Sequence, residues 1–303
     1  MNNKLLRWLA ASCLMAALLS CDNSRPVHYD VLIRGGTIVD GSGAAAYAGD
    51  VAINGDTIVE IGELAGATAT RVIDASGQVV SPGFIDLHTH ADRNIRNNPG
   101  AENYLFQGVT TMLVGNCGNS PVHLDEYFQS VEETRIAPNL GMLIGHNAVR
   151  AEVMGNDNRA PTDDELAGMK ALVKAAMDAG AFGMSTGLIY LPGTYSETDE
   201  VVALARVVAE NDGIYASHIR NEFNLVTDAI TEAITIGREA DLPVQISHFK
   251  VADNTMWGDR TVTLGLVAAA RDEGLDVTVD QYPYTAASTG LINVIPAWAR
   301  AGS

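Results

Sequence analysis

The chain has 303 residues, of which 47% are hydrophobic and 18% are charged, and its formal net charge is −18. This length and apolar content suffice for one large domain with a substantial core, together with a smaller one. The acidic balance and the lack of any basic cluster in the sequence exclude a nucleic-acid-binding protein.

The first 21 residues have the pattern of an export signal. Lys4 and Arg7 precede an apolar stretch, Trp8 to Leu19, that is too short for a comfortable membrane span. The Leu-Leu-Ser-Cys sequence that ends at Cys21 resembles a bacterial lipobox, whose cysteine is lipid-modified. We therefore expect an exported protein, anchored through Cys21 to the periplasmic face of a bacterial membrane. Asp22 resembles an inner-membrane retention signal, and an ordinary secretory signal is the alternative.

Cysteine is rare in this sequence. Cys13 lies in the signal, Cys21 lies at the anchor, and Cys117 stands alone in the mature domain. No disulfide can form within that domain, although an oxidising compartment would permit one. A single thiol in such a compartment needs a reason to persist, and metal ligation would supply one.

Residues 27–81 consist of short apolar runs broken by turn residues. Asn54-Gly55 is a strong hairpin signal, because a type I′ turn needs positive φ at both central residues. The pattern predicts a small β-sandwich, which is too thin to be stable unless it packs on something larger.

Residues 82–303 alternate between apolar runs and amphipathic stretches. The apolar runs recur at intervals of roughly 30 residues, the repeat of βα units. Their centres are Ile85, Met112, Met142, Met184, Tyr215, Ile246 and Val277. Continuous alternation predicts an α/β domain with a parallel sheet, and seven repeats favour a (β/α)8 (TIM) barrel over an open sheet. Since such a barrel has eight strands, we expect one that is incomplete at its C-terminal end.

Helices are predicted between these strands. A capping box over residues 161–165 begins a helix that ends before Gly180. Further helices are expected from Ser196 to Gly213, from Leu225 to Glu239 and from Thr263 to Glu273.

Metal-binding residue types stand where the predicted strands end. His88 and His90 follow the first strand and, two residues apart, point to the same side. Cys117, His218 and His248 follow the second, fifth and sixth strands. Because the C-terminal ends of barrel strands meet at one rim, these side chains are expected to lie together. Thiolate with imidazole selects zinc, which lowers the pKa of a bound water and makes it a nucleophile for an amide or ester carbonyl.

Six motifs surround these residues: PGFIDLHTHAD at 82–92, GNCG at 115–118, STGLIYLPG at 185–193, SHIRNE at 217–222, SHFK at 247–250 and DQYPY at 280–284. They resemble the N-acyl-D-amino-acid deacylases (D-aminoacylases) of the amidohydrolase superfamily, and the similarity runs from about Tyr29 to the C-terminus. GNCG is the most specific motif, since many superfamily relatives use a carboxylated lysine as the bridging ligand where this subgroup uses cysteine.

The resemblance implies a tight zinc at Cys117, His218 and His248, and a second, weaker metal position at His88 and His90 with Cys117 bridging. It implies hydrolysis of small N-acyl-D-amino acids to a carboxylate and a free D-amino acid by metal-activated water.

The resemblance also suggests roles for other side chains. One group would hold the substrate carboxylate or polarise the carbonyl: Tyr190, Arg220 and Lys250. Tyr282 and Tyr284 would line the acyl or side-chain pocket. His146 resembles a family position behind the metal ligands.

The sequence departs from the family pattern at its end. The family's general acid/base aspartate follows strand eight, and Asp280, on predicted strand seven, does not match it. We therefore expect the N-terminal part of a deacylase, with little or no turnover by itself. Two alternatives stay open: another amidohydrolase, such as a cyclic amidase or an isoaspartyl-type dipeptidase, and a non-catalytic zinc-binding lipoprotein fragment. The oligomeric state does not follow from the sequence.

Overall fold

The structure is a computed structural model that describes residues 27–258 and 261–295. The predicted export signal and Cys21 lie outside these residues. The chain divides into two compact units, Met1–Pro82 and Gly83–Ser303. Within the described part of the chain, no helix combines the length and the apolarity needed to cross a membrane.

The first unit contains one mixed sheet in the order β3-β2-β1-β4, with β5 paired to β1. Its strands are β1 (His28–Ile38), β2 (Tyr47–Asn54), β3 (Thr57–Gly62), β4 (Thr68–Asp74) and β5 (Val79–Val80). The register of β1 against β2 shifts between Ile33 and Gly36, so that β4 pairs with the first half of β1 and β5 with the second. The predicted hairpin joins β2 to β3. The predicted strands thus form a single hydrogen-bonded sheet in the described residues.

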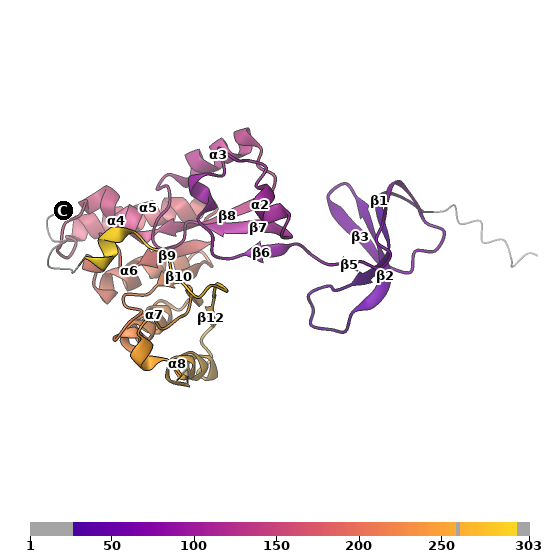
Figure 1. The fold of residues 1–303 in the computed structure, drawn as a ribbon. Coiled ribbons are helices and arrows are strands. Elements are labelled where there is room, and N and C mark those ends of the chain that lie inside the picture. The colour runs from indigo at the N-terminus through magenta and orange to yellow at the C-terminus, as the bar shows by residue number, and fades with distance from the viewer. Residues whose placement is uncertain (1–26, 259–260, 296–303) are drawn as a thin grey trace, which may run out of the picture. The chain divides into compact units, whose positions relative to one another are not determined.

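The second unit is built on seven parallel strands that pair in the order of the sequence, from β6 to β12 (Figure 1). They are β6 (Phe84–Asp86), β7 (Val109–Val114), β8 (Asn139–Gly145), β9 (Gly183–Gly187), β10 (Ile214–His218), β11 (Val244–Ile246) and β12 (Val277–Val279). Among the described residues, β6 and β12 are the two edges of this sheet. The prediction of an α/β domain with an incomplete TIM-type barrel is confirmed.

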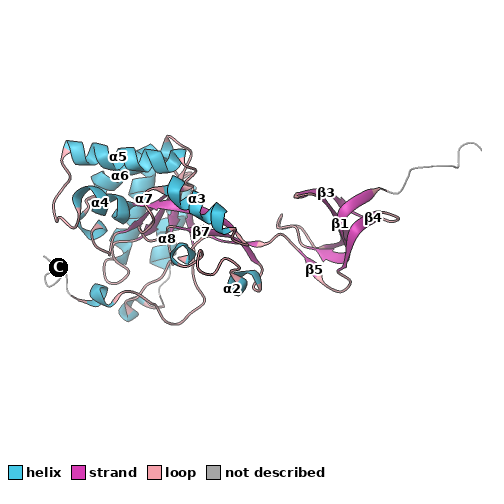
Figure 2. Cartoon of the chain, turned by 90° about the horizontal axis from the view of Figure 1, so that it is seen from above, coloured by secondary structure: helices cyan, strands magenta, loops and turns pink. Residues whose placement is uncertain are grey.

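Helices connect the strands, and α4 to α8 each pack against the next along the chain (Figure 2). The helices are α2 (Glu102–Leu105), α3 (Leu124–Thr134), α4 (His146–Met154), α5 (Asp163–Asp178), α6 (Thr198–Ala209), α7 (Val226–Ala240) and α8 (Thr261–Asp272). Short 3-10 turns are η1 (Ala91–Arg93), η2 (Gly193–Tyr195), η3 (Asn254–Met256) and η4 (Leu291–Val294). The predicted capping box is present at α5, where the Thr162 hydroxyl accepts from the backbone N–H of Glu165 and the Glu165 carboxylate accepts from that of Thr162.

The main core lies between this sheet and its helices. Met112, Met142 and Met184 on the strands are fully buried and belong to one cluster with Val173 of α5 and Leu204 of α6. Burying apolar side chains of this size stabilises the fold by roughly 1.5–3 kcal/mol each. The core therefore holds the strands rigidly, and with them the side chains at their C-terminal ends.

Candidate metal centre

Five potential ligands gather at the C-terminal ends of four strands. His88 and His90 follow β6, Cys117 follows β7, His218 ends β10 and His248 follows β11. Their donor atoms form two groups, one of His88, His90 and Cys117 and one of Cys117, His218 and His248, and within each group the atoms lie within 4.8 Å of one another. The structure therefore brings the five predicted ligands together, with Cys117 shared between the groups.

The distances define a buried group and a more open one. Cys117 Sγ lies 3.4 Å from His88 Nε2 and 3.8 Å from His248 Nε2. His248 Nε2 lies 2.7 Å from His218 Nδ1. Cys117, His218 and His248 are buried, whereas His88 is partly exposed and His90 is exposed. The group with His218 is thus enclosed by protein, and the group with His90 faces solvent.

Two of the potential ligands have a left-handed backbone conformation. Cys117 and His248 both adopt positive φ, at 56° and 37°, a region that non-glycine residues occupy at a cost and mostly at functional sites. Gly115 has φ 77°, and a Cβ there would lie 2.1 Å from the carbonyl oxygen of Leu143. Glycine at position 115 of the GNCG motif is therefore required by the close approach of this turn to β8.

Electrostatics favour a thiolate in this site. Burial opposes ionisation of Cys117, but hydrogen bonds from His218, His248, His88 and His90 outweigh it and lower the pKa of the thiol to about 2. Burial likewise opposes protonation of His88, yet hydrogen bonds with Asp280 and Cys117 raise its pKa to about 10. Thiolate is the form in which cysteine ligates metal ions.

Carboxylates contact the Nδ1 atoms of two of the histidines. Asp280, directly after β12, lies 3.1 Å from His88 Nδ1 and also accepts from the backbone N–H of His248 at 2.7 Å. Glu222 lies 2.9 Å from His248 Nδ1. Neither contact was predicted from the sequence. The spacing of Glu222, four residues after His218, could indicate only the longer approach of these two side chains, at 4.0 Å. Its contact with His248, and that of Asp280 with His88, 192 residues away, have no such signal in the sequence.

Three of the predicted substrate-binding residues line a cavity of about 190 Å³ beside the buried ligand group: Tyr190, Lys250 and Tyr282. The Tyr190 ring packs on His218 with centroids 4.6 Å apart. Lys250 Nζ lies 5.5 Å from the centroid of the Tyr282 ring. The cavity thus combines apolar walls with one cation next to the potential ligands.

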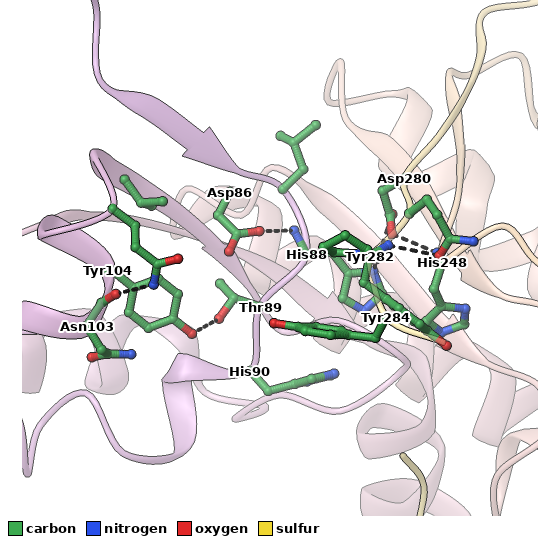
Figure 3. A pocket seen from close by; sticks show the side chains of 15 residues that line it. Asp86, His88, Thr89, His90, Asn103, Tyr104, His248, Asp280, Tyr282 and Tyr284 are labelled. Carbon is green, nitrogen blue, oxygen red and sulfur yellow. Dashed lines mark hydrogen bonds and ion pairs between the residues drawn. The ribbon is translucent and has the colours of Figure 1, made fainter. Parts of the chain in front are cut away.

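A second cavity, of about 570 Å³, opens on the other side of the histidines, between the segments that follow β6 and β12. Figure 3 shows Tyr282 and Tyr284 beside His88 and His90 in this cavity. Tyr284 is 75% exposed there, and Tyr282 lines both cavities.

Two predicted residues lie elsewhere. The Arg220 guanidinium binds the carboxylate of Glu232 at 2.8 Å and the carbonyl oxygens of Thr194 and Ser196, so in this structure it braces the loops and lines neither cavity. His146, the first residue of α4, is fully buried and bonds to Glu200 at 2.9 Å through Nε2.

The residues present fit a zinc ion. A cysteine and imidazole nitrogens within 4.8 Å of one another are the ligand types that zinc prefers. His218 presents Nδ1 to His248, and its other ring nitrogen, Nε2, is buried and lies 4.0 Å from Glu222 Oε1.

Known proteins are similar to this chain in sequence and fold. Residues 71–301 match the amidohydrolase family. The chain is 39% identical over 296 residues to D-aminoacylase from Alcaligenes xylosoxydans xylosoxydans, and the match covers 90% of this chain and 60% of that protein.

Two solved structures are also similar to this chain. A structure of D-aminoacylase, solved to study its binuclear metal centre, superposes with a TM-score of 0.80 at 36% identity and covers 84% of this chain and 59% of its own. A second, N-acyl-D-glutamate deacylase from Bordetella bronchiseptica with zinc and a phosphonate mimic of the tetrahedral intermediate, has a TM-score of 0.80 at 37% identity and covers 85% and 59% of the two chains. The chain belongs to the amidohydrolase family.

Proposed function

We propose that this protein takes part in zinc-dependent hydrolysis of the amide bond of N-acyl-D-amino acids. The observation that carries the proposal is the pair of donor groups that share Cys117. The names of the similar proteins, D-aminoacylase and N-acyl-D-glutamate deacylase, support the substrate class. The chain spans 60% of the length of the D-aminoacylase that it matches. Catalytic activity like that of the whole enzyme is therefore part of the proposal.

In this proposal Cys117, His218 and His248 hold one zinc tightly, and His88 and His90 complete a weaker second site with Cys117. Bound zinc would supply a Lewis acid and lower the pKa of a water molecule. The first group is buried, whereas the exposure of His90 leaves the second group open to solvent.

The chain's own residues would then bind and orient the substrate. Lys250 Nζ provides a positive charge at the wall of the 190 Å³ cavity and would pair with the substrate carboxylate. Tyr190 presents a phenol at the same cavity and would donate to the acyl carbonyl. Tyr282 would contact the apolar part of the substrate.

Binding of a phosphonate analogue tests the proposal without requiring turnover. A methylphosphonyl D-amino acid is expected to bind the zinc-loaded protein at least about tenfold more tightly than its L-enantiomer, a difference of roughly 1.4 kcal/mol. Isothermal titration calorimetry with and without zinc measures this. Equal affinity for both enantiomers would contradict the proposal, and zinc-dependent hydrolysis of a hydantoin would favour a cyclic amidase.

We also propose that the protein is exported and anchored in the membrane by a lipid on Cys21. The basic start, the apolar stretch and the lipobox-like sequence that ends at Cys21 support this. Cys21→Ser is expected to move the protein from the membrane fraction to the soluble periplasmic fraction. The same membrane association in both proteins would refute a lipid anchor at this residue.

A further inference from the structure

Glu222 lies between a potential metal ligand and the cation of the substrate cavity. It follows β10 and precedes α7, and its side chain is 10% exposed. One carboxylate oxygen, Oε1, lies 2.9 Å from His248 Nδ1 and 2.5 Å from Lys250 Nζ. Among the described residues that line the 190 Å³ cavity, Glu222 is the only one with a carboxylate. A single oxygen thus receives hydrogen bonds from both sides of the site.

The backbone around Glu222 is held on both sides. Its carbonyl oxygen accepts from the backbone N–H of Ala252 at 2.7 Å, which ties this segment to the loop after β11. The Asn221 side chain accepts from the backbone N–H groups of Phe223 and Leu225. Just before it, Arg220 is anchored to Glu232 on α7. The loop that carries Glu222 is therefore held by hydrogen bonds and an ion pair. Little further conformational entropy is lost when the contacts of Glu222 form.

The contact with His248 orients its ring. Nε2 of His248 faces Cys117 and His218, while Nδ1 lies 2.9 Å from Glu222 Oε1 and 3.0 Å from Lys250 Nζ. A carboxylate can only accept and an ammonium group can only donate, so Glu222 and Lys250 compete for Nδ1. By binding Lys250 Nζ as well, Glu222 favours the arrangement in which Nδ1 carries the proton and the lone pair on Nε2 points toward the other potential ligands. Carboxylates in this position also orient the ring and increase metal affinity.

We propose that Glu222 is a positioning residue that serves both halves of the site: it aims His248 Nε2 at the metal and holds Lys250 in place for the substrate carboxylate. Asp280 makes the corresponding contact with His88, but Glu222 alone of the two also binds a lysine. The role of Lys250 rests on the proposed function, whereas the effect on metal binding does not.

The metal half is tested with Glu222→Gln, which keeps the shape of the side chain and removes its charge. Zinc affinity, measured by competition with a chromogenic chelator, is expected to fall about 10–100-fold, the usual effect of losing such a partner. Glu273→Gln is the control, because Glu273 is exposed and pairs with Arg238 away from the ligands. An affinity of Glu222→Gln within twofold of the unmodified protein would overturn the proposal.

A second variant separates positioning from simple neutralisation of Lys250. If Glu222 only balanced that charge, the double variant Glu222→Gln/Lys250→Met would bind zinc as tightly as the unmodified protein. We expect it to bind as weakly as Glu222→Gln, and restored affinity would overturn the proposal. Should Glu222→Gln fail to fold, as judged by circular dichroism, Glu222→Asp decides: its shorter side chain is expected to weaken zinc binding, and unchanged affinity would overturn the proposal.

The substrate half is tested at saturating zinc with the methylphosphonyl D-amino acid. Glu222→Gln is expected to weaken its binding about tenfold or more, as loss of a charge-assisted contact does. Unchanged binding would overturn this half. If the phosphonate binds neither this variant nor the unmodified protein, the proposed function and the substrate half fail, while the chelator competition still decides the metal half.

Discussion

Replacement of Glu200 by glutamine is expected to lower the free energy of unfolding by about 3–5 kcal/mol, the usual cost of breaking a buried ion pair from one side. Arg150 is completely buried on α4, and its Nε lies 3.2 Å from Glu200 Oε1 on α6. His146 shares the same oxygen at 2.9 Å. Without the carboxylate, the guanidinium would keep, among the described residues, hydrogen bonds only to the carbonyl oxygens of Asp157 and Arg159, and its charge would be uncompensated.

Equilibrium unfolding in urea, followed by circular dichroism, measures this effect. Glu273→Gln again serves as the control, since an exposed pair contributes about 0–1 kcal/mol. A loss for Glu200→Gln no larger than that of the control would show that the buried network does not stabilise the fold.

The positions of the five potential ligands could be predicted from the sequence because they follow from two simple rules. Side chains two apart on a strand share a face, which pairs His88 with His90. Parallel strands of a barrel end at one rim, which brings Cys117, His218 and His248 to them. Neither rule needs the conformation of any loop, so the approach of these five side chains to one another is predictable from the sequence.

The contacts that support these ligands could not be predicted in this way. Glu222, Asp280 and Arg220 stand on loops, and their partners depend on the path of each loop. Arg220 was expected to hold the substrate carboxylate or polarise the carbonyl, and in this structure a carboxylate and two carbonyl oxygens on neighbouring segments bind its guanidinium. The positive φ of Cys117 likewise belongs to a turn whose close approach to β8, at Gly115, no residue pattern encodes.

Loss of zinc from Cys117→Ala is the second large effect that we expect. Cys117 is the donor that both groups share, and its replacement removes the only thiol near the histidines in the described structure. Even an outer partner of a metal ligand changes affinity about 10–100-fold, so loss of the ligand itself should weaken binding by about 100-fold or more. His28→Ala is a matched control, because His28 bonds to Thr68 and Thr70 in the first unit.

The ratio of zinc to protein after dialysis tests the central claim most directly. We predict about one zinc per chain in the unmodified protein and in His28→Ala, and almost none in Cys117→Ala, as expected for a site whose ligands are preassembled. Full zinc retention by Cys117→Ala, or no zinc in the folded unmodified protein, would contradict a metal centre built around Cys117.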